Sequence, residues 1–250
     1  MRLATWNVNG LRSRLDFVKH WLQARQPDVV GFQELKLTDD QFPAHDFKEL
    51  GYEAVVHGQK SWNGVAILSR HPLELIDKGL DDEMGSRFIA AKVNGIGFST
   101  VYVPNGKSVS HDDYPKKLAW FDQLNERMGR GDLNVICGDF NIVPQPIDTY
   151  KEAPDQIFHT PEERQRLSKL VDLGYEDVFR VLHPDKKMFS WWDYRGGSFH
   201  RNLGLRIDFI LADSHIRERA TAIEIDRDYR KKKDGMTASD HAPVMLDLQA

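Results

Sequence analysis

The chain has 250 residues, of which 40% are hydrophobic and 29% charged, as is ordinary for a globular protein with a sizeable core. Its net charge of −4 argues against a uniformly basic surface, so any contact with nucleic acid or an anionic membrane needs a local basic patch. The single cysteine, Cys137, excludes an internal disulfide, and its apolar neighbours predict a core residue.

Nothing in the sequence indicates a membrane or a secreted protein. No apolar run approaches the roughly 20 residues that a membrane-spanning helix needs. A strand-like pattern begins at Leu3, which leaves no room for a leader sequence before it. We therefore expect a cytoplasmic monomer that does not contact a membrane.

Short segments rich in β-branched or aromatic residues, bounded by Gly, Pro, Asn or Asp, predict strands. They cover 3–7, 28–33, 52–57, 64–69, 88–93, 97–103, 134–137, 207–211, 220–225 and 244–248. Helical periodicity fits SRLDFVKHWLQARQP, LTDDQFPAHDFKELG, DYPKKLAWFDQLNERMG and HTPEERQRLSKLVDLG. In the last, Thr160 and Glu163 predict a capping box, and Thr38 with Gln41 predicts a similar start for the second. This order predicts one α/β domain over residues 1–250, with two mixed sheets packed face to face and helices outside.

Polar side chains gather where the predicted strands end. The motifs ATWNVNG, VVGFQELK, VICGDFNIVP, GLRIDFIL and SDHAP place there Asn7, Asn9, Glu34, Asp139, Asn141, Asp208, Asp240 and His241. Taken singly, most of these residues can be explained as turn formers or as strand ends that meet water. Asp208 is different, because it interrupts an apolar run, and a buried carboxylate needs a partner such as His241.

This set of side chains predicts a particular chemistry. It is rich in carboxylate and amide oxygens, which are ligands for a hard divalent cation, and no Cys/His cluster for zinc is present. Mg²⁺ is typically bound by one or two protein carboxylates, and Glu34 is suited to be one of these ligands. Asp139 could orient or deprotonate a water, and a histidinium held by an Asp could neutralise charge on phosphate oxygens. The residues therefore predict metal-assisted hydrolysis of a phosphate ester.

The chain resembles the exonuclease III family of apurinic/apyrimidinic endonucleases, within the endonuclease/exonuclease/phosphatase superfamily. The motifs that carry the resemblance, in order, are WNVNGLR, QELK, VYVPNG, GDFNI, FSWWDYR, LGLRID and SDHAP. It extends from Leu3 to about Leu248, and FSWWDYR followed by GLRID narrows it to the DNA-repair branch. The resemblance implies a four-layered α/β sandwich. It also implies a Mg²⁺- or Mn²⁺-dependent hydrolase of double-stranded DNA in base-excision repair, acting at abasic sites and as a 3′→5′ exonuclease.

The resemblance also implies roles for single residues. Glu34 binds the metal, Asp139 activates the attacking water and Asn141 holds the scissile phosphate. The implied metal site comprises Asn7, Asn9, Glu34, Asp139, Asn141, Asp240 and His241. The implied catalytic residues are Tyr102, Asp139, Asn141, Asp208 and His241, with Tyr102 against the phosphate or the leaving oxygen.

An apolar pocket of Trp191, Leu205 and Ile207 is implied for the deoxyribose that has lost its base. On an alternating strand only one of Trp191 and Trp192 can face such a pocket. Local cations are candidates for contacts with duplex phosphates. They are Arg12, Arg14, Lys36, Lys60, Arg87, Lys107, Lys116, Lys117, Arg201, Arg206 and the basic residues of 227–233.

Two positions depart from the family pattern. Asn9 stands where some relatives carry Asp, which puts the metal affinity in doubt. Phe158 occupies a position that is often small in relatives that cut at abasic sites. A bulky ring there could crowd a continuous strand and favour strand ends, or it could simply pack inward.

Two other functions stay open. One is a small-molecule or lipid phosphoesterase of the same superfamily, against which GLRID and Trp191 argue. The other is a catalytically silent nucleic-acid-binding relative. Such a protein should have lost part of the set Glu34, Asp139, Asn141, Asp208 and His241, and all five are present.

Overall fold

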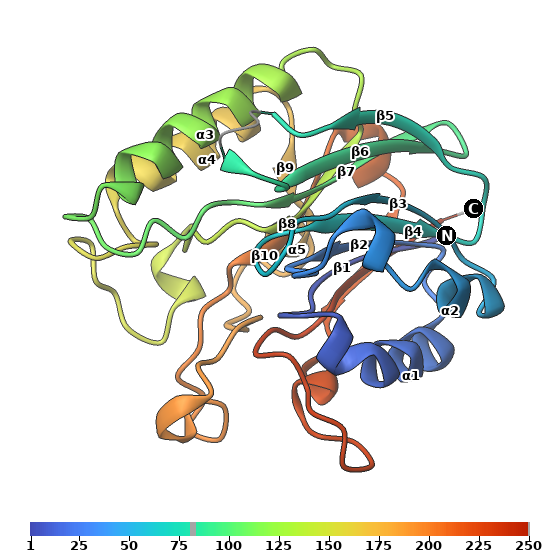
Figure 1. Cartoon of the computed structure of the whole chain (residues 1–250). Coiled ribbons are helices and arrows are strands. Elements are labelled where there is room, and N and C mark those ends of the chain that lie inside the picture. The colour runs from blue at the N-terminus through green and yellow to red at the C-terminus, as the bar shows by residue number, and fades with distance from the viewer. Residues whose placement is uncertain (81–83, 250) are drawn as a thin grey trace.

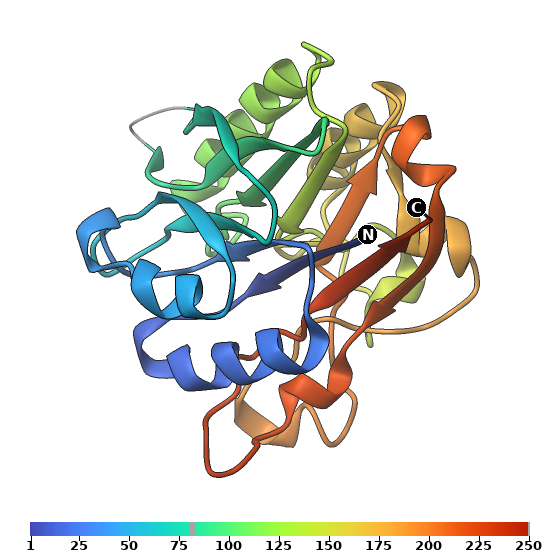
Figure 2. The same cartoon turned by 90° about the vertical axis from the view of Figure 1, so that its right-hand side faces the viewer.

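The computed structural model describes residues 1–80 and 84–249. Two six-stranded sheets pack face to face, and helices cover their outer faces (Figures 1 and 2). The strand orders are β11–β12–β1–β2–β4–β3 and β5–β6–β7–β8–β10–β9. This arrangement confirms the predicted four-layered α/β sandwich with two mixed sheets.

The first sheet contains β1 (Arg2–Asn7), β2 (Val29–Gln33), β3 (Glu53–His57), β4 (Val65–Ser69), β11 (Ala220–Ile225) and β12 (Val244–Leu248). The second contains β5 (Glu74–Lys78), β6 (Phe88–Val93), β7 (Ile96–Tyr102), β8 (Val135–Asp139), β9 (Glu176–Asp177) and β10 (Asp208–Ala212). The pairs β1–β2 and β7–β8 are parallel, and the other paired strands are antiparallel.

Helices α1 (Leu15–Arg25) and α2 (Ala44–Glu49) lie on the first sheet, and α3 (Asp113–Met128) and α4 (Pro161–Asp172) lie on the second (Figure 1). The shorter elements are α5 (Val178–Leu182), α6 (Ser214–Arg217), η1 (Arg12–Arg14), η2 (Asp39–Gln41), η4 (Pro146–Asp148), η5 (Arg195–Gly197) and η6 (Arg227–Arg230). No helix in the described ranges has the length and apolar character to cross a membrane.

The core follows from the alternation of side chains along the strands. Residues such as Leu3 of β1 and Phe98 of β7 point between the sheets and pack with Cys137, which is buried as predicted. On the outer face of the first sheet, Trp6 packs against Trp21 of α1, with ring centroids 5.2 Å apart. The sheets are therefore fixed from both sides, which makes their strand ends a rigid support for a site.

Most predicted elements are present, with shifted ends. The capping box at Thr160 and Glu163 is confirmed by reciprocal hydrogen bonds. The prediction that an α-helix starts at Thr38 is wrong. Only the short turn η2 follows Thr38, because Pro43 disfavours helical backbone at Phe42, and α2 begins after Pro43. The sequence reading missed β5, an edge strand whose residues are mostly exposed and lack alternation, and the two-residue β9.

Candidate active site

The polar strand ends predicted from the sequence meet at one edge of the two sheets. In the first sheet, β1 ends at Asn7 beside the end of β2, and Glu34 follows directly. In the second sheet, Asp139 is paired with Tyr102 on one side and with Asp208 on the other. Because the sheets are stacked, side chains from both converge on one cleft of about 340 Å³.

Glu34 and Asp139 are joined by a single side chain. The Nδ2 amide of Asn7 donates hydrogen bonds to Oε1 of Glu34 and to Oδ2 of Asp139, both at 2.9 Å. The other oxygen of Glu34 lies 2.9 Å from Nζ of Lys36. Ligand atoms of Glu34, Asp139 and His241 all lie within 4.8 Å of one another, so two carboxylates and an imidazole surround one point of the cleft.

His241 lies between two buried carboxylates. Its Nδ1 lies 2.9 Å from Oδ2 of Asp208, and its Nε2 lies 3.7 Å from Oδ2 of Asp139. The second hydrogen-bond partner of Asp208 is Ser190, whose hydroxyl donates to Oδ2 at 2.6 Å. The Asp208–His241 contact inferred from the sequence is therefore present in the structure.

Burial and charge act in opposite directions on these groups. Burial lowers the pKa of His241, but the charges of Asp208 and Asp139 outweigh it and raise the value to about 10. Burial raises the pKa of Asp139 to about 7, although the nearby His241 charge lowers it. Burial would also raise the pKa of Asp240, but His241 and hydrogen bonds from Trp191 and Asn9 lower it overall. At neutral pH the site therefore contains an imidazolium beside a carboxyl group that can exchange a proton.

Tyr102 lines the cleft next to the carboxylates. Burial and the charges of Glu34 and Asp139 raise the pKa of its phenol well above the ordinary value. The Arg87 guanidinium lies 4.8 Å from the ring centroid and donates a hydrogen bond to the Tyr102 carbonyl. Tyr102 is thus held as a neutral phenol that can donate a hydrogen bond.

Several site residues have a left-handed backbone that L-amino acids seldom adopt. The φ angles are +46° at Asn9, +54° at Glu34, +49° at Asn141 and +74° at Phe158. For a bulky residue such as Phe158 this conformation is unfavourable, and it persists only where the surroundings impose it. Such backbone strain is typical of functional sites, because it holds side chains in positions that relaxed turns would not give.

The prediction that Lys117 contacts the substrate at the surface is wrong. Its side chain is only 1% exposed, so it cannot form the surface contact expected for a phosphate-binding lysine. Its ammonium group donates to the Asn141 carbonyl at 2.7 Å and to Oε1 of Glu163 at 2.5 Å. Arg206 is likewise buried, with its Nε 2.7 Å from Oδ1 of Asp148. Both cations therefore lie inside the protein, where they support the walls of the cleft and do not face its opening.

The predicted apolar pocket is partly formed by one side chain of the Trp pair. Trp191 lines the cleft and donates from Nε1 to Oδ2 of Asp240 at 3.0 Å, whereas Trp192 is fully buried. Trp191 and Phe158 pack against a small cluster of Val143, Leu205 and Ile207. The ring of Phe158 also lies 4.9 Å from Nζ of Lys117. Phe158 therefore both packs against the wall and faces the cleft.

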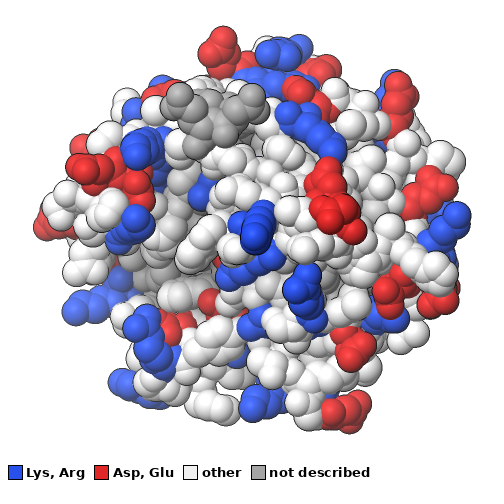
Figure 3. Space-filling model, in the orientation of Figure 1, with Lys and Arg blue, Asp and Glu red and all other residues white. Residues whose placement is uncertain are grey.

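The other predicted residues line the cleft, lie behind it or lie at its edge. Most of the predicted residues line the cleft, and Asn7 and Asp208 are buried behind it. The residues that line the cleft are Glu34, Tyr102, Lys107, Asp139, Asn141, Phe158, Trp191, Ile207, Asp240 and His241. Asn9 lies at its edge, with its oxygen bonded to Lys36 and its amide to Asp240. Lys and Arg side chains border a hollow on this face, with carboxylate atoms inside it (Figure 3).

Sequence reasoning missed four residues of the cleft. Asn105 and Ile157 line it, as do Asp193 and Arg195. Asn105 belongs to VYVPNG and the latter two to FSWWDYR, so the motifs pointed to these segments without identifying the side chains. Ser190, which precedes Trp191, was missed as the partner of Asp208, because a single serine between aromatic residues gives no distinct signal.

Comparisons with known proteins agree with this geometry. A model of the endonuclease/exonuclease/phosphatase family matches residues 4–241. Exodeoxyribonuclease III of Haemophilus influenzae is 34% identical over the full length of both chains, and an exodeoxyribonuclease of Bacillus subtilis is 30% identical over 98% of each.

Two solved structures match the whole chain and are themselves matched over their full length. The 3′ phosphatase NExo from Neisseria, bound to a product DNA hairpin, has a TM-score of 0.95 and 37% identity. An AP endonuclease from Archaeoglobus fulgidus has a TM-score of 0.94 and 35% identity. Together these full-length matches establish that the chain belongs to the endonuclease/exonuclease/phosphatase family, in the branch that contains exodeoxyribonuclease III.

Proposed function

We propose that this protein is a divalent-metal-dependent DNA phosphodiester hydrolase of base-excision repair. In this proposal it incises 5′ to abasic sites, removes nucleotides from 3′ ends and trims blocked 3′ termini. The observation that carries the proposal is the cluster of Glu34, Asp139 and His241 next to the apolar wall of Trp191 and Ile207. The relatives named as exodeoxyribonucleases and as an AP endonuclease support the choice of DNA. The family match across residues 4–241 also supports our view that the chain is one domain.

The donor set fits a hard metal ion. Glu34 and Asp139 offer carboxylate oxygens close to His241, and Asp240 lines the same cleft. Oxygen ligands with few nitrogen donors and no thiolate suit Mg²⁺ or Mn²⁺. We propose that Glu34 is the main ligand, with Asp240 and Asn141 near the ion. When bound, the metal would polarise a phosphate oxygen and stabilise the leaving oxygen.

Asp139 is proposed as the group that orients and deprotonates the attacking water. Its pKa of about 7 matches a general base that works near neutral pH, and Asn7 and the backbone N–H of Asn141 fix its two oxygens. Protonated His241 then faces the phosphate as a fixed positive charge, held by Asp208. The neutral phenol of Tyr102 is placed to donate to the phosphate or to the leaving oxygen.

The apolar wall supplies the selectivity for damaged sites. A deoxyribose without a base can lie against the apolar wall of Trp191 and Ile207, and in this proposal an intact base is excluded from that wall. Selection by a small apolar pocket needs no contact with a specific base. We therefore expect the same incision at abasic sites opposite any of the four bases.

One experiment separates this function from its alternatives. The protein is incubated with a duplex carrying one internal tetrahydrofuran abasic analogue, with a duplex ending in a 3′ phosphate, and in parallel with phosphoinositide or sphingomyelin, each with Mg²⁺ or with EDTA. We expect cleavage 5′ to the analogue and release of the 3′ phosphate, both abolished by EDTA. Binding without cleavage in Mg²⁺ or Mn²⁺ would identify a silent relative. Hydrolysis of a phosphoinositide or sphingomyelin instead of either DNA would identify a lipid phosphoesterase.

A further inference from the structure

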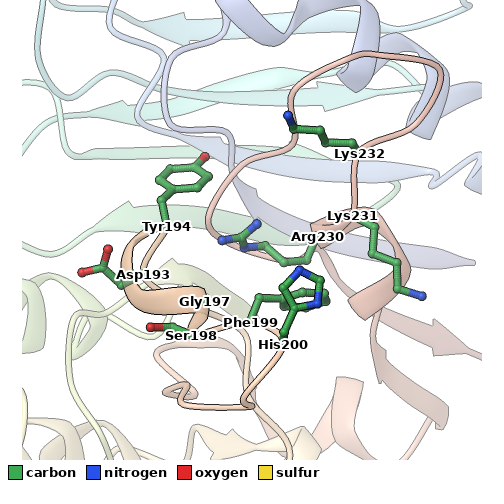
Figure 4. Close-up of a pocket in the computed structure, with 9 residues that line it drawn as sticks. All are labelled: Asp193, Tyr194, Gly197, Ser198, Phe199, His200, Arg230, Lys231 and Lys232. Atoms are coloured by element: carbon green, nitrogen blue, oxygen red, sulfur yellow. The ribbon is translucent and has the colours of Figure 1, made fainter.

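A second pocket, of about 360 Å³, lies between two loops that are far apart in the sequence. One loop contains residues 193–200 and the other residues 230–232; Arg230 extends from the second loop toward Tyr194 and Phe199 of the first, whereas the Lys231 side chain points away (Figure 4). Asp193 lines this pocket and also the catalytic cleft. The pocket is therefore adjacent to the cleft, but none of the residues assigned a catalytic role above lines it.

A buried cation forms the centre of this pocket. Arg230 is only 9% exposed, and its guanidinium donates to the carbonyls of Trp192 and Asp240 at 3.0 and 3.1 Å. It forms no salt bridge with any residue in the ranges 1–80 and 84–249. Buried charges in proteins are normally paired with an opposite charge, because desolvating a lone ion is costly. Asp193 and Asp240 act on this charge from beyond ion-pair distance, so the guanidinium is fixed by two carbonyls and not by a carboxylate partner.

Aromatic rings form the walls. The Arg230 guanidinium lies 4.8 Å from the ring centroid of Tyr194 and 5.3 Å from that of Phe199. Tyr194 is 48% exposed, but its hydroxyl is fixed, since it donates to the Ala238 carbonyl at 2.8 Å and accepts from Arg14 at 3.0 Å. Nucleobases stack on aromatic rings and on guanidinium planes, so this is a preformed surface for a flat ligand.

The rim is positively charged. Lys231 and Lys232 are both exposed, and Lys231 lies 3.2 Å from Asp228. Lys232 has no ion pair with any residue that the structure describes. Asp193 is the one carboxylate among the described lining residues, and Arg195 neutralises it at 2.9 Å. A flat apolar interior with a cationic rim matches a nucleotide, which combines an aromatic base with a phosphate.

We propose that this pocket binds one unpaired nucleotide of a DNA strand. The base packs against Tyr194 and Arg230, and the adjoining phosphate meets Lys232. The inference rests on the proposed function, because a strand that occupies the catalytic cleft can reach the pocket past Asp193. The pocket would then bind a frayed or displaced nucleotide next to the lesion, which a fully paired duplex does not offer.

The test uses the full chain in EDTA, so that DNA is bound but not cut. The probes are the tetranucleotide (dA)₄ and a tetramer of four tetrahydrofuran abasic units. Binding is followed by the amide NMR shifts of Gly197 and Ser198, which line the pocket. We expect (dA)₄ to shift both amides and to bind roughly tenfold more tightly than the abasic tetramer, because stacking requires a base. Equal affinities for the two tetramers, or no shift at these amides with saturating (dA)₄, would overturn the proposal.

Variants then locate the contacts. Lys232→Glu should weaken (dA)₄ binding roughly tenfold, whereas Lys92→Glu changes the charge equally on an exposed position of β6 outside the pocket and should have little effect. Tyr194→Leu should remove the preference for (dA)₄ over the abasic tetramer, and Tyr194→Phe should keep it. Equal losses of (dA)₄ affinity in both lysine variants, or an unchanged preference for (dA)₄ in Tyr194→Leu, would contradict nucleotide binding in this pocket. Mg²⁺-dependent incision of the abasic duplex is measured separately, so incision without pocket shifts refutes this inference and leaves the proposed function intact.

Discussion

His241 contacts Asp208 through Nδ1 at 2.9 Å and turns its Nε2 toward Asp139, 3.7 Å away. This relation makes the histidine a fixed positive charge, because the pKa of about 10 keeps it protonated through the physiological range. Asp208 is buried, and among the described side chains its partners are Ser190 and His241. Neither member of the pair should function fully without the other.

The first prediction follows from this pairing. Asp208→Asn and His241→Asn should each lower kcat/KM by roughly 10²-fold or more, since each removes the same positioned charge. Because the two residues act as a unit, the double variant should be little worse than the more damaged single variant. Steady-state kinetics on the abasic duplex measure all four proteins. Losses that multiply would mean that the two residues act independently.

The second prediction concerns pH and stability. Burial is the largest cause that raises the folded-state pKa of Asp139 from 3.8 to about 7. Folding therefore favours the protonated form, and this stabilisation is complete below about pH 3.8 and is lost as the pH rises through about 7. Asp139→Asn, which resembles the protonated acid, should unfold at a higher temperature than wild type in EDTA. The difference should grow between about pH 4 and pH 7 and level off at higher pH.

Thermal unfolding followed by circular dichroism in EDTA measures this difference. For a chain of this size, about 1 kcal/mol shifts Tm by roughly 2–4 °C. The same variant should lose DNA cleavage, so a gain in stability accompanies a loss of function. A Tm difference that does not change with pH would show that Asp139 is ionised with an ordinary pKa in the folded protein.

The third prediction concerns the metal. Glu34→Ala should fold normally but need a much higher Mg²⁺ concentration for half-maximal cleavage, because it removes the main proposed ligand. A Mg²⁺ titration of activity measures the shift, and Glu53→Ala, at an exposed position of β3, is the control. Full activity of Glu34→Ala in EDTA would rule out the metal role.

The convergence of the candidate active-site residues was predictable because they break the hydrophobic pattern of the strands. Asp208 interrupts an apolar run, and Glu34, Asp139 and His241 stand where strands end. Once β1 pairs with β2 and β8 with β10, these positions must meet at one edge. Strand ends are fixed by short-range pattern, so the sequence carries this information locally.

The burial of Lys117 could not be predicted from the sequence pattern. Lys117 follows Lys116 on α3, and both are expected to be exposed by pattern. The difference arises because α4 places Glu163 opposite Lys117, while Lys116 remains exposed. A contact between residues 46 positions apart depends on helix packing, which periodicity does not determine. The pocket at Arg230 was missed for the same reason, since its two loops meet only in the folded chain.

The fourth prediction tests Lys117 as a positioning residue. Lys117→Met leaves Glu163 buried without its cation, which should destabilise the protein by about 3–5 kcal/mol. The double variant Lys117→Met/Glu163→Gln should recover much of that stability. It should not recover kcat, because the Asn141 carbonyl still lacks the donor that holds it. Lys48→Met, at an exposed position of α2, is the control and should change neither stability nor rate. Recovery of kcat together with stability would make the role of Lys117 purely structural.

Phe158 is the residue on which we expect the balance between the two DNA activities to depend. Its ring packs with Leu205 and Ile207, yet it also lines the cleft, next to Trp191. A ring in this place crowds a strand that continues through the cleft, whereas a strand that ends can pivot away from it. Wild type should therefore favour 3′-end removal over incision at internal abasic sites.

Replacing the ring should reverse that preference. Phe158→Gly and Phe158→Ser should both raise internal incision relative to 3′ exonuclease activity, with unchanged Mg²⁺ dependence. A change of about 1.4 kcal/mol in relative barriers is a tenfold change in the ratio, which labelled duplexes resolve. Glycine also relieves the positive φ of +74°, while serine does not, so an equal effect in both variants assigns the change to the ring rather than to the backbone. If both activities fall together, or the ratio stays constant, Phe158 serves only to pack the wall of the cleft.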